Sequence, residues 1–438
     1  MRRVSHPPSR RSPAKWDNSV IPSVARNLQL KLHLQTFGCR ANHYDTDAVR
    51  ALAVSAGHEI VDDAIEADVA VFNSCAVTAE AERDVRKAVR RAAKQNPRLR
   101  SVVMGCAAAL PASQPALRAL PTVTHVVPGA DRTAIAAALA ISLQPSASRL
   151  QPQTTVRAVL RIQDGCDEHC TFCATTLARG ANRSRAVDEL VREANQLADH
   201  HPEIVITGTH IGTYGADIGS SLGRLMQRLV TAVPRVRFRL SSVEATEVDD
   251  ALVELFVSDP RRLAPHLHAP LQSGSDRLLR RMGRHWYTAE SYARAIERLA
   301  ARLSVFGLGA DIIVGFPGET EADFAATVAL VERLPFTYLH VFAYSQRPGT
   351  AATRLPDHVP LSATHARSHH LRHLAQAKGN EYKRSRAGGT ADAIVITAAP
   401  KREVMTEDYL TLPVEDAHPR GQRLAVRLQM VGDTLTAL

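Results

Sequence analysis

Three cysteines lie close together in the segment 161–180, RIQDGCDEHCTFCATTLARG. They are Cys166, Cys170 and Cys173, separated by three and then two residues. Iron–sulfur clusters are usually held by four thiolates. Three cysteines can therefore hold three irons of a [4Fe–4S] cluster and leave the fourth iron without a protein ligand. Such an iron can bind a small molecule, which is useful in an enzyme and unnecessary in an electron carrier.

A structural zinc site is the alternative for this segment. Zinc needs four ligands, and the only other candidate within the segment is His169. Because His169 directly precedes Cys170, its side chain is expected to point away from the other three. The spacing therefore favours an iron–sulfur cluster.

The length and composition indicate a globular protein with more than one domain. A chain of 438 residues, with 45% hydrophobic and 22% charged residues, is long enough for two or three domains. No segment approaches the ~18 uninterrupted apolar residues that a membrane helix needs, and the N-terminus lacks the apolar run of a secretory signal. We expect no membrane association, and a basic N-terminal tail (1–27) that is either disordered or transit-like.

Cysteine use and charge bear on localisation and partners. Thiolates committed to clusters suit a reducing compartment, whereas disulfides suit an oxidising one, so we expect a cytoplasmic protein. The formal net charge of +10 is uneven, because Lys and Arg gather in residues 1–31 and 362–388. Charge alone therefore leaves RNA binding open.

Residues 28–142 alternate between strand and helix patterns, which predicts an N-terminal α/β (Rossmann-like) sheet domain. The predicted strands 28–37, 68–73 and 101–105 are each followed by a cysteine: Cys39, Cys75 and Cys106. The carboxyl ends of parallel strands meet at one sheet edge, where such folds bind ligands. Buried cysteines that act as small hydrophobic residues are the alternative. Because no cysteine is left over beside the first triplet, we favour a second cluster with an open iron.

Capping and breaking signals assign the other elements of this domain. Asp45 is predicted to cap a helix that continues to Val54, and a second helix covers 79–95. A strand at 123–127 and a helix at 131–142 complete the domain. Residues 143–155, rich in Pro, Ser and Gln, are predicted to be a linker.

Residues 156–360 repeat a strand, a loop and a helix about six times. This pattern predicts a partial (β/α)6 barrel that is open on one side. Active-site residues of such barrels lie in the loops after the strands. Here those loops are rich in Gly, Ser, Thr and Gln, which suits a polar cofactor. The predicted strands are 156–163, 203–207, 235–241, 266–271, 308–314 and 336–343.

A basic helix over 361–385 is predicted to connect the barrel to a last domain, residues 386–438. That domain has predicted strands at 392–399, 408–414 and 423–431 and no long helix. Short strands separated by turns suggest a small β-barrel of a kind that binds nucleic acid. The predicted fold class is therefore α/β with a small C-terminal β-barrel.

Motifs in all three parts resemble those of the radical S-adenosylmethionine (SAM) methylthiotransferases, over residues 30–438. The cysteine spacing at 166–173 resembles the radical SAM signature, and TFGCRAN, FNSCAVT and MGCAA resemble the motifs around the family's N-terminal cysteines. RGANRSR, LHAPLQSGSD, DIIVGFPGET and FAYSQRPGT resemble barrel motifs, and TEDYLTLPV resembles the middle of the family's C-terminal RNA-binding β-barrel, the TRAM domain. One departure follows Cys173, where the family usually has an aliphatic pair and Pro and this chain has Ala174-Thr175-Thr176.

The resemblance implies an enzyme that inserts sulfur into an unreactive C–H bond and methylates it, with SAM and two [4Fe–4S] clusters as cofactors. The cysteines at 166–173 would hold the cluster that cleaves SAM to a 5′-deoxyadenosyl radical. Those at 39, 75 and 106 would hold an auxiliary cluster whose open iron carries the sulfur, which a first SAM methylates. No general base is assigned, because the target carbon carries no acidic proton. The residues expected to contact SAM are Phe172, Gly208, Ser241, Ile313, Val314 and Gly315, with a core role for Phe172 equally open.

Within the family, the segments NSCAVTAEAERDVRKAVRRA, IQDGC and GTHIGTYG resemble the branch that acts on N6-threonylcarbamoyladenosine in tRNA, next to the anticodon. The isopentenyladenosine branch usually has Ile-Arg where this chain has Val77-Thr78, and a third branch modifies an aspartate of a ribosomal protein. The resemblance implies as partners the anticodon stem-loop of tRNA, an electron donor such as a flavodoxin or ferredoxin, and a sulfur donor.

Two alternatives of other classes stay open from the residues alone. One is a radical SAM enzyme of different chemistry, in which the second cluster relays electrons. The other is a non-catalytic RNA-binding iron–sulfur protein that senses redox state. The helix at 79–95 carries basic residues that form either a solvated face or a contact with tRNA phosphates; they are Arg83, Arg86, Lys87, Arg90, Arg91 and Lys94.

Overall fold

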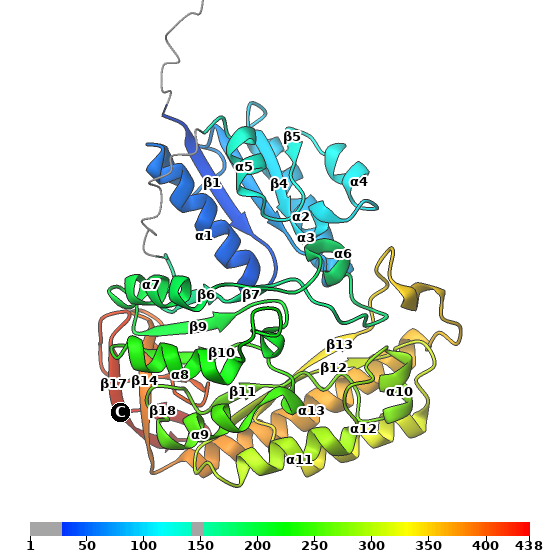
Figure 1. Cartoon of the computed structure of the whole chain (residues 1–438), viewed down its shortest axis with the longest axis vertical. Helices are drawn as coiled ribbons and strands as arrows, with labels where there is room; N and C mark the ends of the chain where they lie inside the picture. The colour runs from blue at the N-terminus through cyan, green and yellow to red at the C-terminus, as the bar shows by residue number, and fades with distance from the viewer. Residues whose placement is uncertain (1–28, 142–152) are drawn as a thin grey trace, which may run out of the picture.

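The computed structural model describes residues 29–141 and 153–438. The predicted tail at 1–27 and most of the predicted linker at 143–155 lie outside the described residues. The described chain forms an N-terminal α/β sheet domain (blue to cyan in Figure 1), a partial barrel (green to yellow) and a C-terminal β-sheet (orange to red). No helix in these ranges is both long and apolar enough to cross a membrane.

The N-terminal domain is a parallel sheet in the order β2-β1-β3-β4-β5, with an apolar cluster on each face. Its central strand β3, VAVFNS, is buried along its whole length, as expected for a parallel strand covered on both faces. The elements are β1 (Lys31–Thr36), α1 (Arg40–Ser55), β2 (Glu59–Val61), β3 (Val69–Ser74), α2 (Ala79–Gln95), β4 (Arg100–Gly105), α3 (Cys106–Ala109), α4 (Gln114–Arg118), β5 (Val123–Val126) and α5 (Arg132–Ala138).

The prediction that Asp45 caps the first helix is wrong. Helix α1 begins at Arg40, with Cys39 at the N-cap position, and Asp45 lies buried one turn inside it. Its carboxylate accepts hydrogen bonds from Arg161 (2.5 Å) and Arg179 (2.9 Å) of the barrel. Tertiary ion pairs therefore place this acidic residue in a helix interior. The short edge strand β2 was also not predicted.

The central domain is a partial barrel of six parallel strands in chain order. Two three-stranded sheets, β6-β9-β10 and β11-β12-β13, are joined by parallel bridges between β10 and the β11 region. The barrel elements are β6 (Ala158–Arg161), β7 (Gln163–Asp164), α6 (Thr175–Arg179), β8 (Arg183–Ser184), α7 (Val187–Ala198), β9 (Glu203–Thr207), α8 (Leu222–Ala232), β10 (Arg237–Leu240), α9 (Asp250–Ser258), β11 (His266–His268), α10 (Asp276–Arg281), α11 (Ala289–Ala300), β12 (Gly307–Val314), α12 (Glu321–Arg333) and β13 (Tyr338–Ala343). Short 3-10 turns lie at Ile211–Thr213, Ala245–Glu247 and Ala351–Arg354.

Two glycines of β12 make room inside the barrel. A Cβ at Gly309 would lie 2.0 Å from the ring of Tyr338, and one at Gly307 would lie 2.0 Å from the carbonyl oxygen of Asp408. The alternate residues of the strand, such as Leu308, pack into the core beneath the outer helices. The glycines therefore let an aromatic ring and a turn of the C-terminal sheet enter the barrel interior.

The C-terminal part is an antiparallel sheet in the order β16-β15-β14-β17-β18, and a bridge from Val414 to Ala437 nearly closes it into a barrel. The predicted fold class is confirmed. The predicted single strand at 408–414 is wrong, because β15 and β16 flank a turn there. The elements are α13 (Leu361–Arg386), β14 (Thr390–Thr397), β15 (Glu403–Met405), β16 (Thr411–Pro413), β17 (Arg423–Val431) and β18 (Thr434–Ala437).

Buried charges join the barrel to the C-terminal sheet. The Glu203 carboxylate lies 2.6 Å from Nε of Arg237 and 2.9 Å from Nε of Arg239, and all three side chains are fully buried. The same guanidinium groups donate to the carbonyl oxygens of Asp392 and Glu407 in the C-terminal sheet. Burial opposes ionisation of Glu203, but the two guanidinium groups outweigh it and hold the pKa of Glu203 well below its usual range.

Glu203→Gln should lower the free energy of unfolding by about 3–5 kcal/mol, because two buried guanidinium groups lose their shared counter-charge. The lowered pKa means that this stabilisation is complete above the unfolded-state pKa near 4.5 and is lost as the pH falls. Thermal unfolding at pH 7 measures the effect. Glu254→Gln removes an exposed partner of Arg302 and is the matched control, with no expected change. Equal melting temperatures for the two variants would contradict the prediction.

Candidate active site

The first cysteine triplet lies in a loop, 166–173, that follows the first barrel strand. The short strands β7 and β8, which flank this loop in the sequence, pair with each other. The Cys166 N–H donates to the carbonyl oxygen of Gly180 (3.0 Å). At the other end of the loop, the Thr171 N–H donates to the carbonyl oxygen of Met282 (2.8 Å). The loop is therefore attached to the barrel on both sides, which fixes the direction of its three thiols.

Each sulfur of this triplet has an N–H donor. The sulfurs of Cys166 and Cys173 accept from the backbone two residues further on, at 3.4 and 3.3 Å, and Nη1 of Arg284 lies 3.5 Å from the sulfur of Cys170. Burial raises the pKa of the Cys170 thiol to about 12. A thiolate there needs a positive counter-charge, which iron supplies. The donor set of three cysteines fits a [4Fe–4S] cluster with one open iron.

A pocket of about 160 Å³ lies beside the triplet and mixes aromatic with polar side chains. Residues from four loops that follow strands and from the segment between α10 and α11 line it, which places the pocket at the carboxyl ends of the strands, as predicted for a barrel enzyme. Besides the cysteines, the lining includes Phe172, Thr209, His210, Ser242, Glu244, Gln272, Arg284 and Trp286.

The predicted SAM contacts at Phe172, Gly208 and Ser241 fall close to this pocket. Phe172 lines it and also packs edge-on against Phe316, with ring centroids 6.4 Å apart, so its position does not decide between a core role and a contact with SAM. Gly208 and Ser241 directly precede Thr209 and Ser242, which line the pocket. Their contact with SAM stays a prediction.

The predicted contacts at Ile313, Val314 and Gly315 are not among the residues that line the pocket, although the Ile313 N–H donates to the carbonyl oxygen of the lining residue Gln272 (3.0 Å). Val314 is in the barrel core, and the Gly315 N–H donates to the Glu319 carboxylate (2.6 Å). Ile313 is partly buried in the apolar cluster that holds Phe172. These three contacts also stay predictions.

A buried ion pair in the pocket was not predicted. The Arg284 guanidinium donates to the Glu244 carboxylate and lies over the Trp286 ring at 4.7 Å. Glu244 follows strand β10, in a loop that the barrel pattern indicates. Arg284 lies between α10 and α11, where no sequence signal identifies it.

The second triplet, Cys39, Cys75 and Cys106, follows three adjacent strands of the N-terminal sheet, β1, β3 and β4. The segments approach closely: a Cβ at Gly38 would lie 2.9 Å from Cβ of Cys75. Burial raises the pKa of the Cys106 thiol to about 11. The structure thus brings the three thiols to one sheet edge, as the spacing predicts.

Helix α6 connects the two triplets. It starts two residues after Cys173 and ends at Arg179, whose Nε donates to the sulfur of Cys106 (3.2 Å). The same guanidinium donates to Asp45 (2.9 Å) and Asp164 (3.0 Å). The two sulfur sites therefore lie at opposite ends of one five-residue helix.

The residues after Cys173, where the sequence departs from the family pattern, have defined contacts. Ala174 is buried against Ala107 and Leu110 of the N-terminal domain. The Cys173 thiol lies 3.0 Å from the Thr175 hydroxyl. The small residues at this position therefore allow the two domains to pack closely.

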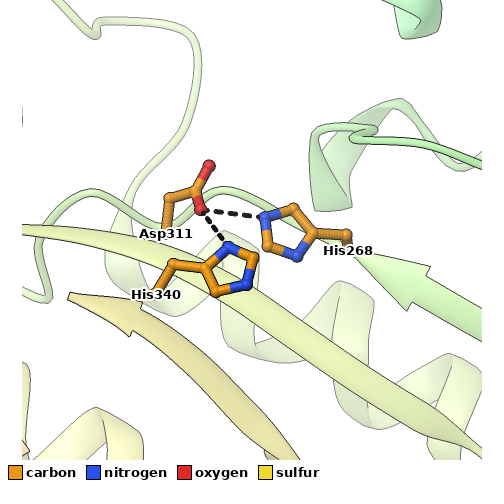
Figure 2. A group of neighbouring side chains, drawn as sticks. All are labelled: His268, Asp311 and His340. Carbon is orange, nitrogen blue, oxygen red and sulfur yellow. Dashed lines mark hydrogen bonds and ion pairs between the residues drawn. The ribbon is translucent and has the colours of Figure 1, made fainter. Parts of the chain in front are cut away.

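A cluster of two histidines and an aspartate lies inside the barrel, on strands β11, β12 and β13 (Figure 2). Oδ1 of Asp311 lies 3.0 Å from Nε2 of His268 and 3.2 Å from Nδ1 of His340. The Tyr338 hydroxyl bonds to His268 (3.0 Å) and His266 (2.9 Å). Two imidazoles and a carboxylate can hold a transition metal. In this arrangement, however, both imidazoles bond to one carboxylate oxygen, so the cluster is satisfied without a metal ion.

Comparisons with known proteins identify the family. Residues 31–128 match the family described as "Uncharacterized protein family UPF0004", and residues 160–331 match the radical SAM superfamily. The threonylcarbamoyladenosine tRNA methylthiotransferase MtaB of Bacillus subtilis is 38% identical over 79% of this chain and 80% of its own. The MtaB of Aquifex aeolicus is 32% identical over 91% of this chain and 100% of its own. The chain belongs to the radical SAM methylthiotransferase family.

The predictions of family and of an enzyme are therefore confirmed, and membership implies SAM and a [4Fe–4S] cluster as cofactors of this methylthiotransferase. A tRNA-2-methylthio-N(6)-dimethylallyladenosine synthase of Acidithiobacillus ferrooxidans is also similar, at 33% identity over 92% of this chain and 93% of its own. The radical SAM methyltransferase TsrM of Kitasatospora setae has a similar fold, with a TM-score of 0.55 and 14% identity over 85% of this chain and 79% of its own.

Removing Arg284 should make the radical SAM cluster of this methylthiotransferase harder to reduce, because a cation and an N–H donor at the Cys170 sulfur are lost. A hydrogen bond is worth about 1 kcal/mol, which corresponds to roughly 40 mV for one electron. Arg284→Met is made in a Glu244→Gln background, so that no unpaired carboxylate stays buried. A redox titration followed by electron paramagnetic resonance compares it with Glu244→Gln alone. The same potential in both proteins would contradict the prediction.

Proposed function

We propose that this enzyme methylthiolates carbon 2 of N6-threonylcarbamoyladenosine in tRNA, next to the anticodon. Relatives named for this activity support tRNA as the substrate, and the sequence motifs support this branch. The observation that carries the proposal is the pairing of two cysteine triplets across helix α6. One triplet lies beside a pocket that we assign to SAM, and the proposal assigns delivery of the sulfur atom to the other.

The cysteines divide between two roles in this proposal. Those at 166–173 hold the [4Fe–4S] cluster that cleaves SAM, and those at 39, 75 and 106 hold a second [4Fe–4S] cluster that carries the transferred sulfur. Arg284 donates to a sulfur of the first set and Arg179 to a sulfur of the second. A buried carboxylate holds each arginine in place, Glu244 for Arg284 and Asp45 for Arg179, so that its N–H groups stay directed at the sulfur.

Further partners follow from the chemistry. The first cluster needs an electron donor such as a flavodoxin or ferredoxin, and the second needs a sulfur donor. We infer that the C-terminal sheet is a TRAM domain that binds tRNA, in a cytoplasmic setting.

Helix α2 provides a second surface for RNA in this proposal. Its buried Glu82 pairs with Arg347 of the barrel at 2.7 Å, so the helix begins beside the active-site loops.

Neutralising exposed arginines and lysines of α2 should weaken tRNA binding. Arg83→Gln, Arg90→Gln and Lys94→Gln together remove three exposed cations from the helix, and each lost phosphate contact lowers the slope of log K against log salt by about 0.7–0.9. We expect a slope smaller by about 2. Filter binding of tRNA across a salt series measures the slope. An unchanged slope would mean that the basic residues of this helix form a solvated face and do not contact tRNA.

Mass spectrometry of tRNA nucleosides, from cells with and without the gene, tests the function. We expect loss of 2-methylthio-N6-threonylcarbamoyladenosine and accumulation of its unthiolated parent. Loss of the isopentenyl product instead would move the enzyme to the other tRNA branch. No change in either nucleoside would overturn the tRNA assignment and leave the ribosomal-protein aspartate to be tested.

Complementation with cysteine variants separates the two proposed clusters. Neither Cys170→Ala nor Cys106→Ala should restore the methylthio product in cells. Purified Cys106→Ala protein should still release 5′-deoxyadenosine from SAM when reduced, and Cys170→Ala protein should not. A redox sensor without catalysis would release none even as the unaltered protein.

A further inference from the structure

Arg40 is a cation that lies beside the second cysteine triplet. It is the first residue of α1, directly after Cys39, and its Nη2 donates to the Tyr409 hydroxyl (3.0 Å). Within the part of the chain that the structure describes, its guanidinium forms no ion pair. The nearby Arg161, by contrast, lies 2.5 Å from the Asp45 carboxylate. Arg40 thus reaches from the N-terminal domain to the C-terminal sheet with its charge unbalanced.

The surroundings of Tyr409 carry an excess of positive charge. The guanidinium carbons of Arg157 and Arg239 lie 5.8 and 5.3 Å from the centre of its ring. Both arginines pair with the same carboxylate, that of Glu203, at 3.4 and 2.9 Å. Burial alone would raise the pKa of Tyr409, but the guanidinium groups of Arg40, Arg157 and Arg239 outweigh burial and lower it. An anionic group from outside the chain would balance this region.

A groove leads from solvent to Tyr409. One wall is the edge strand β13, with Tyr338, His340 and Phe342 facing the groove, and the other is formed by the turn at 409–411 and by α13. The His340 side chain is 54% exposed and Phe342 is 39% exposed. In the described residues β13 is an edge strand (Figure 1), so no further strand covers this side of the groove. Arg40 does not itself line the groove but bonds to Tyr409, which does.

The chemistry of the substrate fits this position. Carbon 2 and N6 of adenosine lie on the same edge of the base, because N1 joins carbon 2 to carbon 6, which carries N6. If sulfur is delivered to carbon 2 from beside Cys39, a group on N6 lies in the same region as Arg40. The threonylcarbamoyl group ends in a carboxylate, which a guanidinium binds strongly and often through two hydrogen bonds. An isopentenyl group has no charge and no hydrogen-bond acceptor, so it cannot bind the Arg40 guanidinium in this way.

We propose that Arg40, positioned by the Tyr409 hydroxyl, binds the carboxylate of the threonylcarbamoyl group and thereby selects this nucleoside over one with an apolar N6 substituent. This inference rests on the proposed function and adds to it the residue that determines specificity. Arg40 contacts the substrate, whereas Tyr409 acts through Arg40 as a positioning residue.

Binding of synthetic anticodon stem-loops to the cluster-loaded, full-length protein tests the proposal. The stem-loops carry N6-threonylcarbamoyladenosine, its carboxylate methyl ester or N6-isopentenyladenosine. A charge-assisted hydrogen bond predicts that the unaltered protein prefers the acid to the ester by about tenfold to a hundredfold. Arg40→Gln should bind acid and ester equally, and Arg40→Lys should keep part of the preference. Arg302→Gln, which alters an exposed arginine on the outer surface, should keep all of it.

Other outcomes separate the possible failures. Should Arg40→Gln lose the adjacent cluster, Tyr409→Phe, which lies far from the cysteines in sequence, should still lower the acid-to-ester preference. If Arg40 instead binds a tRNA phosphate, Arg40→Gln weakens all three stem-loops by one factor and keeps the ratio, which overturns this inference alone. This inference alone is also overturned if the unaltered enzyme methylthiolates the stem-loop with the acid but binds the stem-loop with the ester equally well. No product from the acid overturns the proposed function and this inference with it.

Discussion

One guanidinium group links the two halves of the candidate active site. Arg179 donates to the Cys106 sulfur and to carboxylates of both domains, at Asp45 and Asp164. Its pKa lies above the usual range, because these anions outweigh the cost of burying it. A charge buried in this way is costly unless its partners stay in place. The relative position of the N-terminal sheet and the barrel, and hence of the two cysteine triplets, depends on this contact.

The C-terminal sheet packs into the open side of the barrel and lines a groove there. Its Tyr409 enters the barrel and stacks on His266, with ring centroids 4.4 Å apart. Gly307 leaves space for the preceding residue of the same turn, Asp408. The buried charges around Glu203 join the sheet to two barrel strands. Buried ion pairs and hydrogen bonds therefore attach the C-terminal sheet to the barrel.

Much of the fold could be predicted because its signals are local. The basic helix at 79–95 has the predicted bounds, since a capping threonine and an apolar stripe define it within one segment. The barrel strands were found for the same reason. The Asp45 cap was wrong because two arginines more than 115 residues away keep this carboxylate inside a helix. The β15–β16 turn was missed because Tyr409, which belongs to the barrel interior, looks like a strand residue in its own segment.

The sequence by itself determined the chemistry: two sets of three thiols, one clustered and one at strand ends, and the order of the domains that hold them. Only the tertiary structure decided which charges face those thiols. Arg284 carries no motif, and the motif that contains Arg40 does not reveal its contact with Tyr409; each acquires its role from partners distant in the chain. The spacing of cysteines can be read from the sequence of a short segment. The electrostatic field around a buried sulfur, by contrast, depends on which helices and strands pack against it.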